Sequence, residues 1–233
     1  MHTIAVSVKG PSHHTTGLPN QDFCKVRKVP TGWLAVVCDG MGSKQFADIG
    51  SRIATQAVYD VIKKSSFQID SKHLIKAIYQ QWLNLLDSVA PREAVTTCLI
   101  AWYTHDGRYR TFQLGDGLLI SSRSLTAGQH KKLNNRDFGN VTTGLGISTK
   151  YSDWTESHGK LGPSEYLALM TDGISEDITE GLEDDFIQEV IEHTKAKSAR
   201  QAKTWLKNEL RNWATPNHLD DKTLALLVLN NER

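Results

Sequence analysis

Acidic residues mark the ends of apolar, strand-like runs in this chain, and no other feature constrains its fold more. A strand end holds a side chain in a fixed position while leaving it open to solvent. Hard divalent cations such as Mg²⁺ bind oxygen ligands held in this way. The pattern therefore predicts one metal site where four segments meet: Asn20-Gln21-Asp22; Asp39-Gly40-Met41-Gly42 after residues 33–37; Asp172-Gly173 after residues 166–170; and Asp220-Asp221 before residues 223–228.

Composition narrows the class of protein. The chain has 27 Lys and Arg against 26 Asp and Glu, and this formal net charge of +1 argues against a nucleic-acid partner. No stretch approaches the roughly 18 apolar residues that a membrane helix needs. The first residues lack the basic and apolar regions of a signal peptide. We therefore expect no nucleic-acid partner and no membrane partner.

The three cysteines, Cys24, Cys38 and Cys98, are odd in number and widely spaced. This pattern predicts a reducing, cytoplasmic location without a disulfide framework. None belongs to a Cys-x-x-Cys pair, which argues against a zinc site. Because Cys38 precedes Asp39, it is either a reactive thiol or a small buried hydrophobic residue at a strand end, and we favour the second interpretation.

Hydrophobic periodicity predicts the secondary structure. Apolar residues recur at helical spacing in two early and two late segments, and Ser71 is a suitable N-cap. His105-Asp106-Gly107 and Gly115-Asp116-Gly117 predict two successive hairpin turns. The expected helices are 45–64, 71–89, 183–194 and 198–213, and the expected strands are 3–9, 33–38, 95–103, 109–114, 118–122, 166–171 and 223–229.

This order does not alternate strand and helix, so a doubly wound parallel sheet is not expected. Four amphipathic helices suit a single α+β domain over residues 1–233, with the helices covering the outer faces of packed sheets. The chain contains no repeat and no evident interdomain linker. The polar segment 124–150 is long for a loop, and it has room for short strands.

Taken in order, these motifs resemble the metal-dependent serine/threonine protein phosphatases of type 2C, in a compact bacterial form. The resemblance covers residues 7–229. One Asp-Gly pair is usually only a turn, whereas seven matching segments in one order are far more specific. They are Asn20-Gln21-Asp22, Asp39-Gly40-Met41-Gly42 with the following helix, Thr96-Thr97, Gly115-Asp116-Gly117, Thr143-Gly144-Leu145-Gly146, Asp172-Gly173-Ile174-Ser175-Glu176 and Asp220-Asp221-Lys222-Thr223.

The resemblance implies a four-layer α-β-β-α sandwich, in which two antiparallel sheets lie between helices and metal sits at one end of the channel between them. It implies that Asp39 bridges two Mn²⁺ or Mg²⁺ ions. The carbonyl of Gly40 would bind the first ion, and Asp172 and Asp220 would complete the second. Asp22 would lie behind these ligands and hold a water.

The resemblance extends to a third, weaker ion. Asp116 and Glu176 match positions associated with it in the family. Glu176 is one methylene longer than the usual Asp, and the alternative is that both are acids of surface turns. This part of the metal set is therefore the least specific.

The chain departs from the family at the first metal and at the phosphate. Gln21 replaces a common Glu and removes one negative charge, and Met41 replaces a His that some members carry. The Arg that often clamps the phosphate is absent from residues 16–19. We expect His13, in preference to His14 or Lys9, to replace it as a donor to phosphate or to the leaving alkoxide. The alternative is that the two histidines are merely exposed in a polar loop.

The resemblance implies a phosphatase that acts on phosphoserine and phosphothreonine of a signalling protein. Two ions would activate a water for in-line attack on phosphorus, and the chain lacks the Cys-x5-Arg and Gly-x-Ser-x-Gly nucleophile motifs. A phosphoprotein made by a Hanks-type kinase is the expected substrate. The alternatives are a weakly active pseudophosphatase or phosphopeptide-binding module, and a hydrolase of small phosphoesters.

Overall fold

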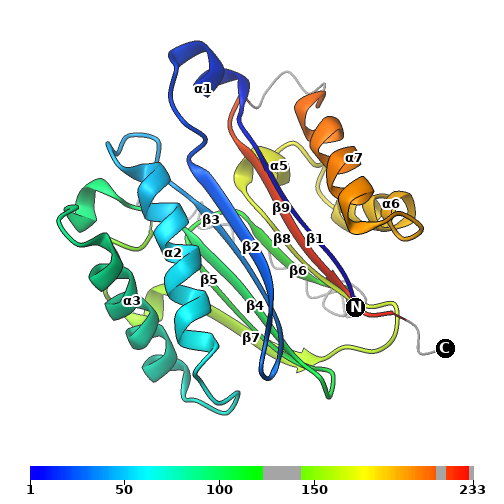
Figure 1. Ribbon diagram of the computed structural model, residues 1–233, viewed down its shortest axis with the longest axis horizontal. Helices are drawn as coiled ribbons and strands as arrows, with labels where there is room; N and C mark the ends of the chain where they lie inside the picture. The colour runs from blue at the N-terminus through cyan, green and yellow to red at the C-terminus, as the bar shows by residue number, and fades with distance from the viewer. Residues whose placement is uncertain (123–142, 214–218, 231–233) are drawn as a thin grey trace.

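The computed structural model describes residues 1–122, 143–213 and 219–230. They form two antiparallel sheets packed face to face, with helices on both outer faces (Figure 1). The four-stranded sheet has the order β1 (His2–Val8), β9 (Lys222–Val228), β8 (Tyr166–Met170), β6 (Leu118–Ser121). The five-stranded sheet has the order β2 (Asp22–Val29), β3 (Gly32–Asp39), β4 (Cys98–Thr104), β5 (Arg108–Leu114), β7 (Thr155–Lys160).

Two pairs of helices form the outer layers. One pair, α2 (Ala47–Ile62) and α3 (Ser71–Leu86), covers the five-stranded sheet, and the other, α6 (Glu183–Thr194) and α7 (Ala199–Arg211), covers the four-stranded sheet (Figure 1). The expected α-β-β-α sandwich is confirmed. Two short helices, α1 (Pro11–Thr16) and α5 (Asp172–Ser175), lie at one end of the sheets.

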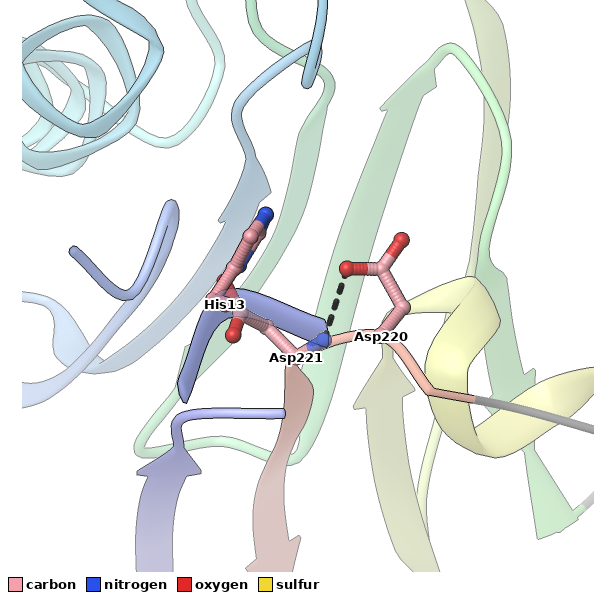
Figure 2. Close-up of side chains that lie close together, drawn as sticks. All are labelled: His13, Asp220 and Asp221. Carbon is pink, nitrogen blue, oxygen red and sulfur yellow. Dashed lines mark hydrogen bonds and ion pairs between the residues drawn. The ribbon is translucent and has the colours of Figure 1, made fainter. Parts of the chain in front are cut away.

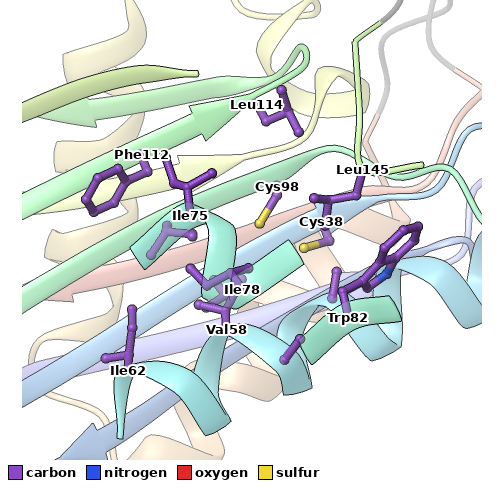
Figure 3. Close-up of a cluster of buried hydrophobic side chains, with 14 of the residues drawn as sticks. Cys38, Val58, Ile62, Ile75, Ile78, Trp82, Cys98, Phe112, Leu114 and Leu145 are labelled. Carbon is purple, nitrogen blue, oxygen red and sulfur yellow. The ribbon is translucent and has the colours of Figure 1, made fainter. Parts of the chain in front are cut away.

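The central strands β3, β4, β8 and β9 are mostly apolar on both faces because both faces are covered. Along β3, Leu34, Val36 and Cys38 pack toward α2 and α3, while Ala35 and Val37 pack toward the other sheet. Continuous apolar runs are typical of strands buried in this way. Figure 3 shows the first of these layers, where side chains of α2 and α3, including Trp82, meet those of the sheet.

Cys38 is fully buried in that layer, beside Cys98 (Figure 3). All three cysteines carry free thiols. Burial, followed by a hydrogen bond with Cys98, raises the pKa of the Cys38 thiol well above its ordinary value. Since the thiolate is the reactive form, Cys38 behaves as a packing residue, as we favoured.

The structure corrects four details of the expected elements. Gly115-Asp116-Gly117 is not a hairpin turn, because β5 and β6 belong to different sheets and the turn carries the chain from one to the other. His13 and His14 lie in helix α1 and not in a loop. The N-cap of α3 is Asp70, whose carboxylate accepts from the backbone of His73, and not Ser71.

The fourth correction concerns two strands that periodicity missed. β2 carries charged residues between its apolar ones, and β7 (Thr155–Lys160) has no apolar stripe at all. Both are edge strands, where one side meets solvent and the hydrophobic pattern weakens. Most of segment 124–150 lies outside the described residues. Within the described ranges, no helix is long and apolar enough to cross a bilayer.

Candidate metal-binding active site

A pocket of about 200 Å³ opens at the end of the sandwich where the acidic strand ends meet. Six of the predicted site residues line it, and they come from five separate segments of the chain: His13, Asp39, Gly40, Asp116, Asp172 and Asp220. The sequence therefore predicted the convergence of these residues, even though up to 207 positions separate them (His13 to Asp220).

Asp39 is held by hydrogen bonds to its backbone on both sides. Its N–H donates to the hydroxyl of Thr97 at 2.9 Å, and its carbonyl accepts from the Thr96 hydroxyl at 2.8 Å and from the Thr97 N–H at 2.8 Å. The carboxylate is left to face the pocket. The Thr96-Thr97 pair thus fixes the last residue of β3 in place.

Asp172 is the first residue of α5, directly after β8. Its buried Oδ1 has no hydrogen-bond partner among the described residues. A buried carboxylate oxygen without a donor is costly, and a cation would satisfy it. The next residue is Gly173, where a Cβ would lie 2.1 Å from the carbonyl oxygen of Asp221. Only glycine permits this approach, which brings Asp172 close to the Asp220-Asp221 segment.

The two adjacent acids Asp220 and Asp221 have different surroundings (Figure 2). Asp220 is exposed, and one of its carboxylate oxygens accepts from the Asp221 N–H at 2.7 Å. Asp221 is 2% exposed, and its carboxylate accepts from Gly10 N–H at 2.7 Å, Gln21 N–H at 2.6 Å and His13 Nδ1 at 2.9 Å. The exposed carboxylate of Asp220 is accessible to a cation, whereas the carboxylate of Asp221 is already hydrogen-bonded to three donors of the protein.

His13 is therefore held by an acid that the sequence analysis did not assign. Its Nδ1 is hydrogen-bonded to Asp221, and the residue is 9% exposed and lines the pocket. In Figure 2 the other ring nitrogen points away from Asp221. His13, Asp220 and Asp221 also have oxygen or nitrogen atoms within 4.8 Å of one another. Because Asp221 already accepts three hydrogen bonds, we interpret this group as a support for His13 and not as a separate metal site.

Two predicted residues do not line the pocket. Asp22 is 3% exposed, and its carboxylate accepts from the Thr171 hydroxyl at 2.8 Å, so it lies behind the pocket wall. Glu176 is the C-cap of α5 and is exposed. Burial raises the pKa of Asp116, and the charge of Glu176 raises it further. Lys9 is not among the described residues that line the pocket.

The carboxylates raise one another's pKa values. The pKa of Asp39 lies well above its ordinary range. Burial is the largest cause, followed by the charges of the nearby acids Asp22, Asp172, Asp116 and Asp220. Burial also raises the pKa of Asp22 to about 8. No Lys or Arg is present among the described residues lining the pocket. This unbalanced set of oxygen donors fits divalent cations such as Mg²⁺ or Mn²⁺.

The model of the family described as "Protein phosphatase 2C" matches residues 9–211 of the chain. The chain belongs to the protein phosphatase 2C family. The matched range ends before Asp220, so the position of that residue in the site rests on the strand order that brings β9 between β1 and β8. Comparison with curated protein sequences gave no match.

Solved structures of similar proteins share the protein phosphatase 2C fold. The serine/threonine phosphatase of S. agalactiae is 17% identical, with a TM-score of 0.67 and coverage of 99% of both chains. The serine/threonine phosphatase Stp1 from Staphylococcus aureus is also 17% identical, with a TM-score of 0.67 over 99% of this chain and 96% of that one. The PPM Ser-Thr phosphatase MsPP from Mycobacterium smegmatis, solved in complex with cacodylate, is 16% identical, with a TM-score of 0.63 and 99% coverage of both chains.

Proposed function

We propose that this protein hydrolyses phosphoserine and phosphothreonine on proteins, with two Mn²⁺ or Mg²⁺ ions held by Asp39, the Gly40 carbonyl, Asp172 and Asp220. The observation that carries the proposal is the convergence of pocket-facing carboxylates, one of them with a buried oxygen lacking a donor, in a chain of the protein phosphatase 2C family. When bound, the ions would supply a water of lowered pKa and neutralise charge on the phosphoryl oxygens.

The protein's own residues have three tasks in this proposal. Thr96 and Thr97 fix the backbone of Asp39, so that its carboxylate needs no reorganisation to bind. Asp221 fixes the ring of His13, which leaves Nε2 to donate to a phosphate oxygen or to the leaving alkoxide. Asp116 and Glu176 would hold a third, weaker ion.

The wider setting is also proposed. One domain over residues 1–233 would act in the cytoplasm on a phosphoprotein made by a Hanks-type kinase. The family match and the apolar layers shared by elements from both halves of the chain support one domain. The three free thiols support a reducing compartment.

Hydrolysis of p-nitrophenyl phosphate and of a phosphothreonine peptide tests the proposal, with Mn²⁺, with Mg²⁺ and with EDTA. We expect turnover with metal, none with EDTA, and none for Asp39→Asn. Asp185→Asn, an exposed change on α6 with the same charge effect, is the matched control and should retain turnover. Full metal-dependent turnover by Asp39→Asn would overturn the assignment of the site.

A weakly active phosphopeptide-binding module is the second candidate. Two features of the pocket support this candidate. No Lys or Arg is among the described lining residues, and Gln21 and Met41, the two departures from the family pattern, are among them. Calorimetric Mn²⁺ binding by a folded protein that hydrolyses no phosphopeptide would favour this candidate over the phosphatase.

A further inference from the structure

A second and larger depression, of about 550 Å³, lies on the open side of the sandwich. It follows the edge strands β1 and β2, which belong to different sheets and which each pair on one side only within the described residues. In Figure 1 these two strands face the viewer between α2 and α7. Residues of both helices line the depression, together with Leu85 of α3, so it forms a groove with strand edges along it.

The groove is strongly cationic although the chain is nearly neutral. Lys25 and Arg27 from β2, Arg52 from α2 and Lys203 from α7 all line it, and no acidic residue is among the described residues that do. None of these four forms an ion pair with a described carboxylate. Lys25 instead contacts the amide of Gln56 and the ring of Tyr59, both neutral. Burial lowers the pKa of Lys25, and Asp60 is the one carboxylate among the described residues whose charge raises it, so the four cations leave this surface with an excess of positive charge. Such a surface attracts an anionic partner.

The same surface exposes large apolar side chains. Phe23 and Leu85 are each 36% exposed, and Ile53 is partly buried beside them. A phosphate-rich ligand would make no favourable contact with these apolar side chains. A peptide that combines acidic and apolar side chains would contact both the cations and the apolar residues of the groove. The run from Phe23 to Arg27 extends about 13 Å at roughly 3.3 Å per residue, the length of four or five residues of an extended peptide.

The groove adjoins the catalytic pocket along β2. Gln21, which directly precedes β2, lines the pocket, and Phe23 of β2 lines the groove, so the two sites are two residues apart along the chain. This separation is about 7 Å in an extended chain. A polypeptide bound in the groove thus holds neighbouring residues close to the site where phosphate would be removed.

We propose that this groove binds an extended, acidic segment, interspersed with apolar residues, of the phosphoprotein substrate. The proposal rests on the proposed phosphatase function for the role of the segment, but binding itself requires no turnover. The segment adds to the open edges of β1 and β2, as peptides do at exposed strand edges elsewhere. The groove would then supply the selection among substrates that the smaller pocket lacks, since no Lys or Arg is among its described lining residues.

Direct binding tests the proposal separately from catalysis. The probe is a labelled, unphosphorylated peptide of alternating Glu and Val, with a Lys and Val peptide as its comparison, followed by fluorescence anisotropy on the full chain. We expect the acidic peptide to bind and the basic peptide not to bind. Binding should weaken as salt is added, since exposed charges are screened over about 10 Å at 0.1 M salt.

A pair of double variants locates the site. Arg52→Glu with Lys203→Glu reverses two charges of the groove, and Lys64→Glu with Lys76→Glu makes the same charge change on exposed residues elsewhere. We expect the groove variant to lose acidic-peptide affinity by about tenfold or more, and the control by less than about twofold. If thermal unfolding shows that the groove variant is not folded, Leu85→Asp replaces it, with the same loss expected.

Equal affinity in the groove and control variants, or equal binding of both peptides, would overturn the proposal. The groove cations would then serve only to prevent edge-to-edge association of β2. Catalysis gives a further readout. A phosphothreonine peptide with an acidic flank should have a higher kcat/KM than one with a neutral flank, and in the groove variant the two values should be equal. Absence of any turnover would contradict the phosphatase proposal and leave the anisotropy result standing.

Discussion

Two kinds of carboxylate meet at one end of this molecule, and they differ in what satisfies them. Asp22 and Asp221 are 3% and 2% exposed and accept hydrogen bonds from the protein. Asp39 and Asp172 face the pocket, and Asp172 has a buried oxygen without a donor among the described residues. The first kind is bonded to donors of the protein, and the second kind faces the pocket, where a ligand would reach it. Changing one kind should affect stability and changing the other should affect activity.

The largest effect should follow from Asp172→Asn. Losing a ligand oxygen should lower Mn²⁺-dependent hydrolysis by about 10³-fold or more. Without metal the same change should stabilise the fold by on the order of 1 kcal/mol, because it removes a carboxylate whose pKa is raised by burial and by the charges of Asp116 and Asp220. Turnover and urea unfolding in EDTA measure the two effects. A variant that is both active and destabilised would break the distinction between the two kinds.

Asp221→Asn should show the opposite balance. It leaves the donors of Gly10, Gln21 and His13 with a poorer partner in a buried site, at a cost of about 3 kcal/mol in unfolding free energy. Its neighbour Asp220 is exposed, so Asp220→Asn should change stability by less than about 0.5 kcal/mol. Denaturant unfolding of both variants in EDTA makes the comparison. Similar losses for the two would contradict the assignment of Asp221 as the structural acid.

Metal and pH should act together on stability. Mn²⁺ at about 100 times its dissociation constant should add about 2.7 kcal/mol. In EDTA, the folded-state pKa of Asp22, about 8, lies above its unfolded value of 3.8, so the folded protein binds the extra proton. The contribution of this group is therefore present in full below about pH 4 and is lost as pH rises through 8. Thermal unfolding from pH 5 to 8 should show falling stability in EDTA and a weaker fall with Mn²⁺. If stability in EDTA instead rose with pH, the raised pKa of Asp22 would be contradicted.

The smallest effect should follow from His13→Gln. An imidazole that protonates a leaving alkoxide should contribute about 10²-fold to kcat, at the lower end of the range for general acids. That loss should appear with phosphothreonine and be much smaller with p-nitrophenyl phosphate, whose leaving group needs no proton. Comparing kcat for the two substrates provides the test, and His14→Gln is the matched control on the same helix. Equal losses on both substrates would assign His13 to phosphate binding or packing instead.

Much of this fold could be predicted from the sequence because most central strands are continuous apolar runs and the long helices are regularly amphipathic. The edge strands could not, since β7 (Thr155–Lys160) has only polar residues and glycine. The local sequence Gly115-Asp116-Gly117 is typical of a hairpin turn. The next strand nevertheless joins the other sheet, which depends on packing and not on the turn residues.

The convergence of the acids at one end could be predicted from strand ends, but the separate roles of Asp220 and Asp221 could not. The two residues are identical and adjacent, and the difference between them arises from donors that lie about 200 positions away, at Gly10, His13 and Gln21. No local pattern contains that information. The sequence nevertheless held one signal. Because Asp220 and Asp221 directly precede β9, successive side chains there point in different directions, so one carboxylate faces the pocket and the other faces the neighbouring segments.

The pairing of β1 with β9 has a consequence for the protein during its synthesis. Ile4 lies opposite Leu226, so β1 waits for more than 200 further residues to be made before its partner strand exists. At about 5–20 residues per second this delay lasts tens of seconds. Asp220 and Asp221, which supports His13, directly precede β9 and are made just before it. Nascent chains therefore cannot complete the pocket until β9 has left the ribosome.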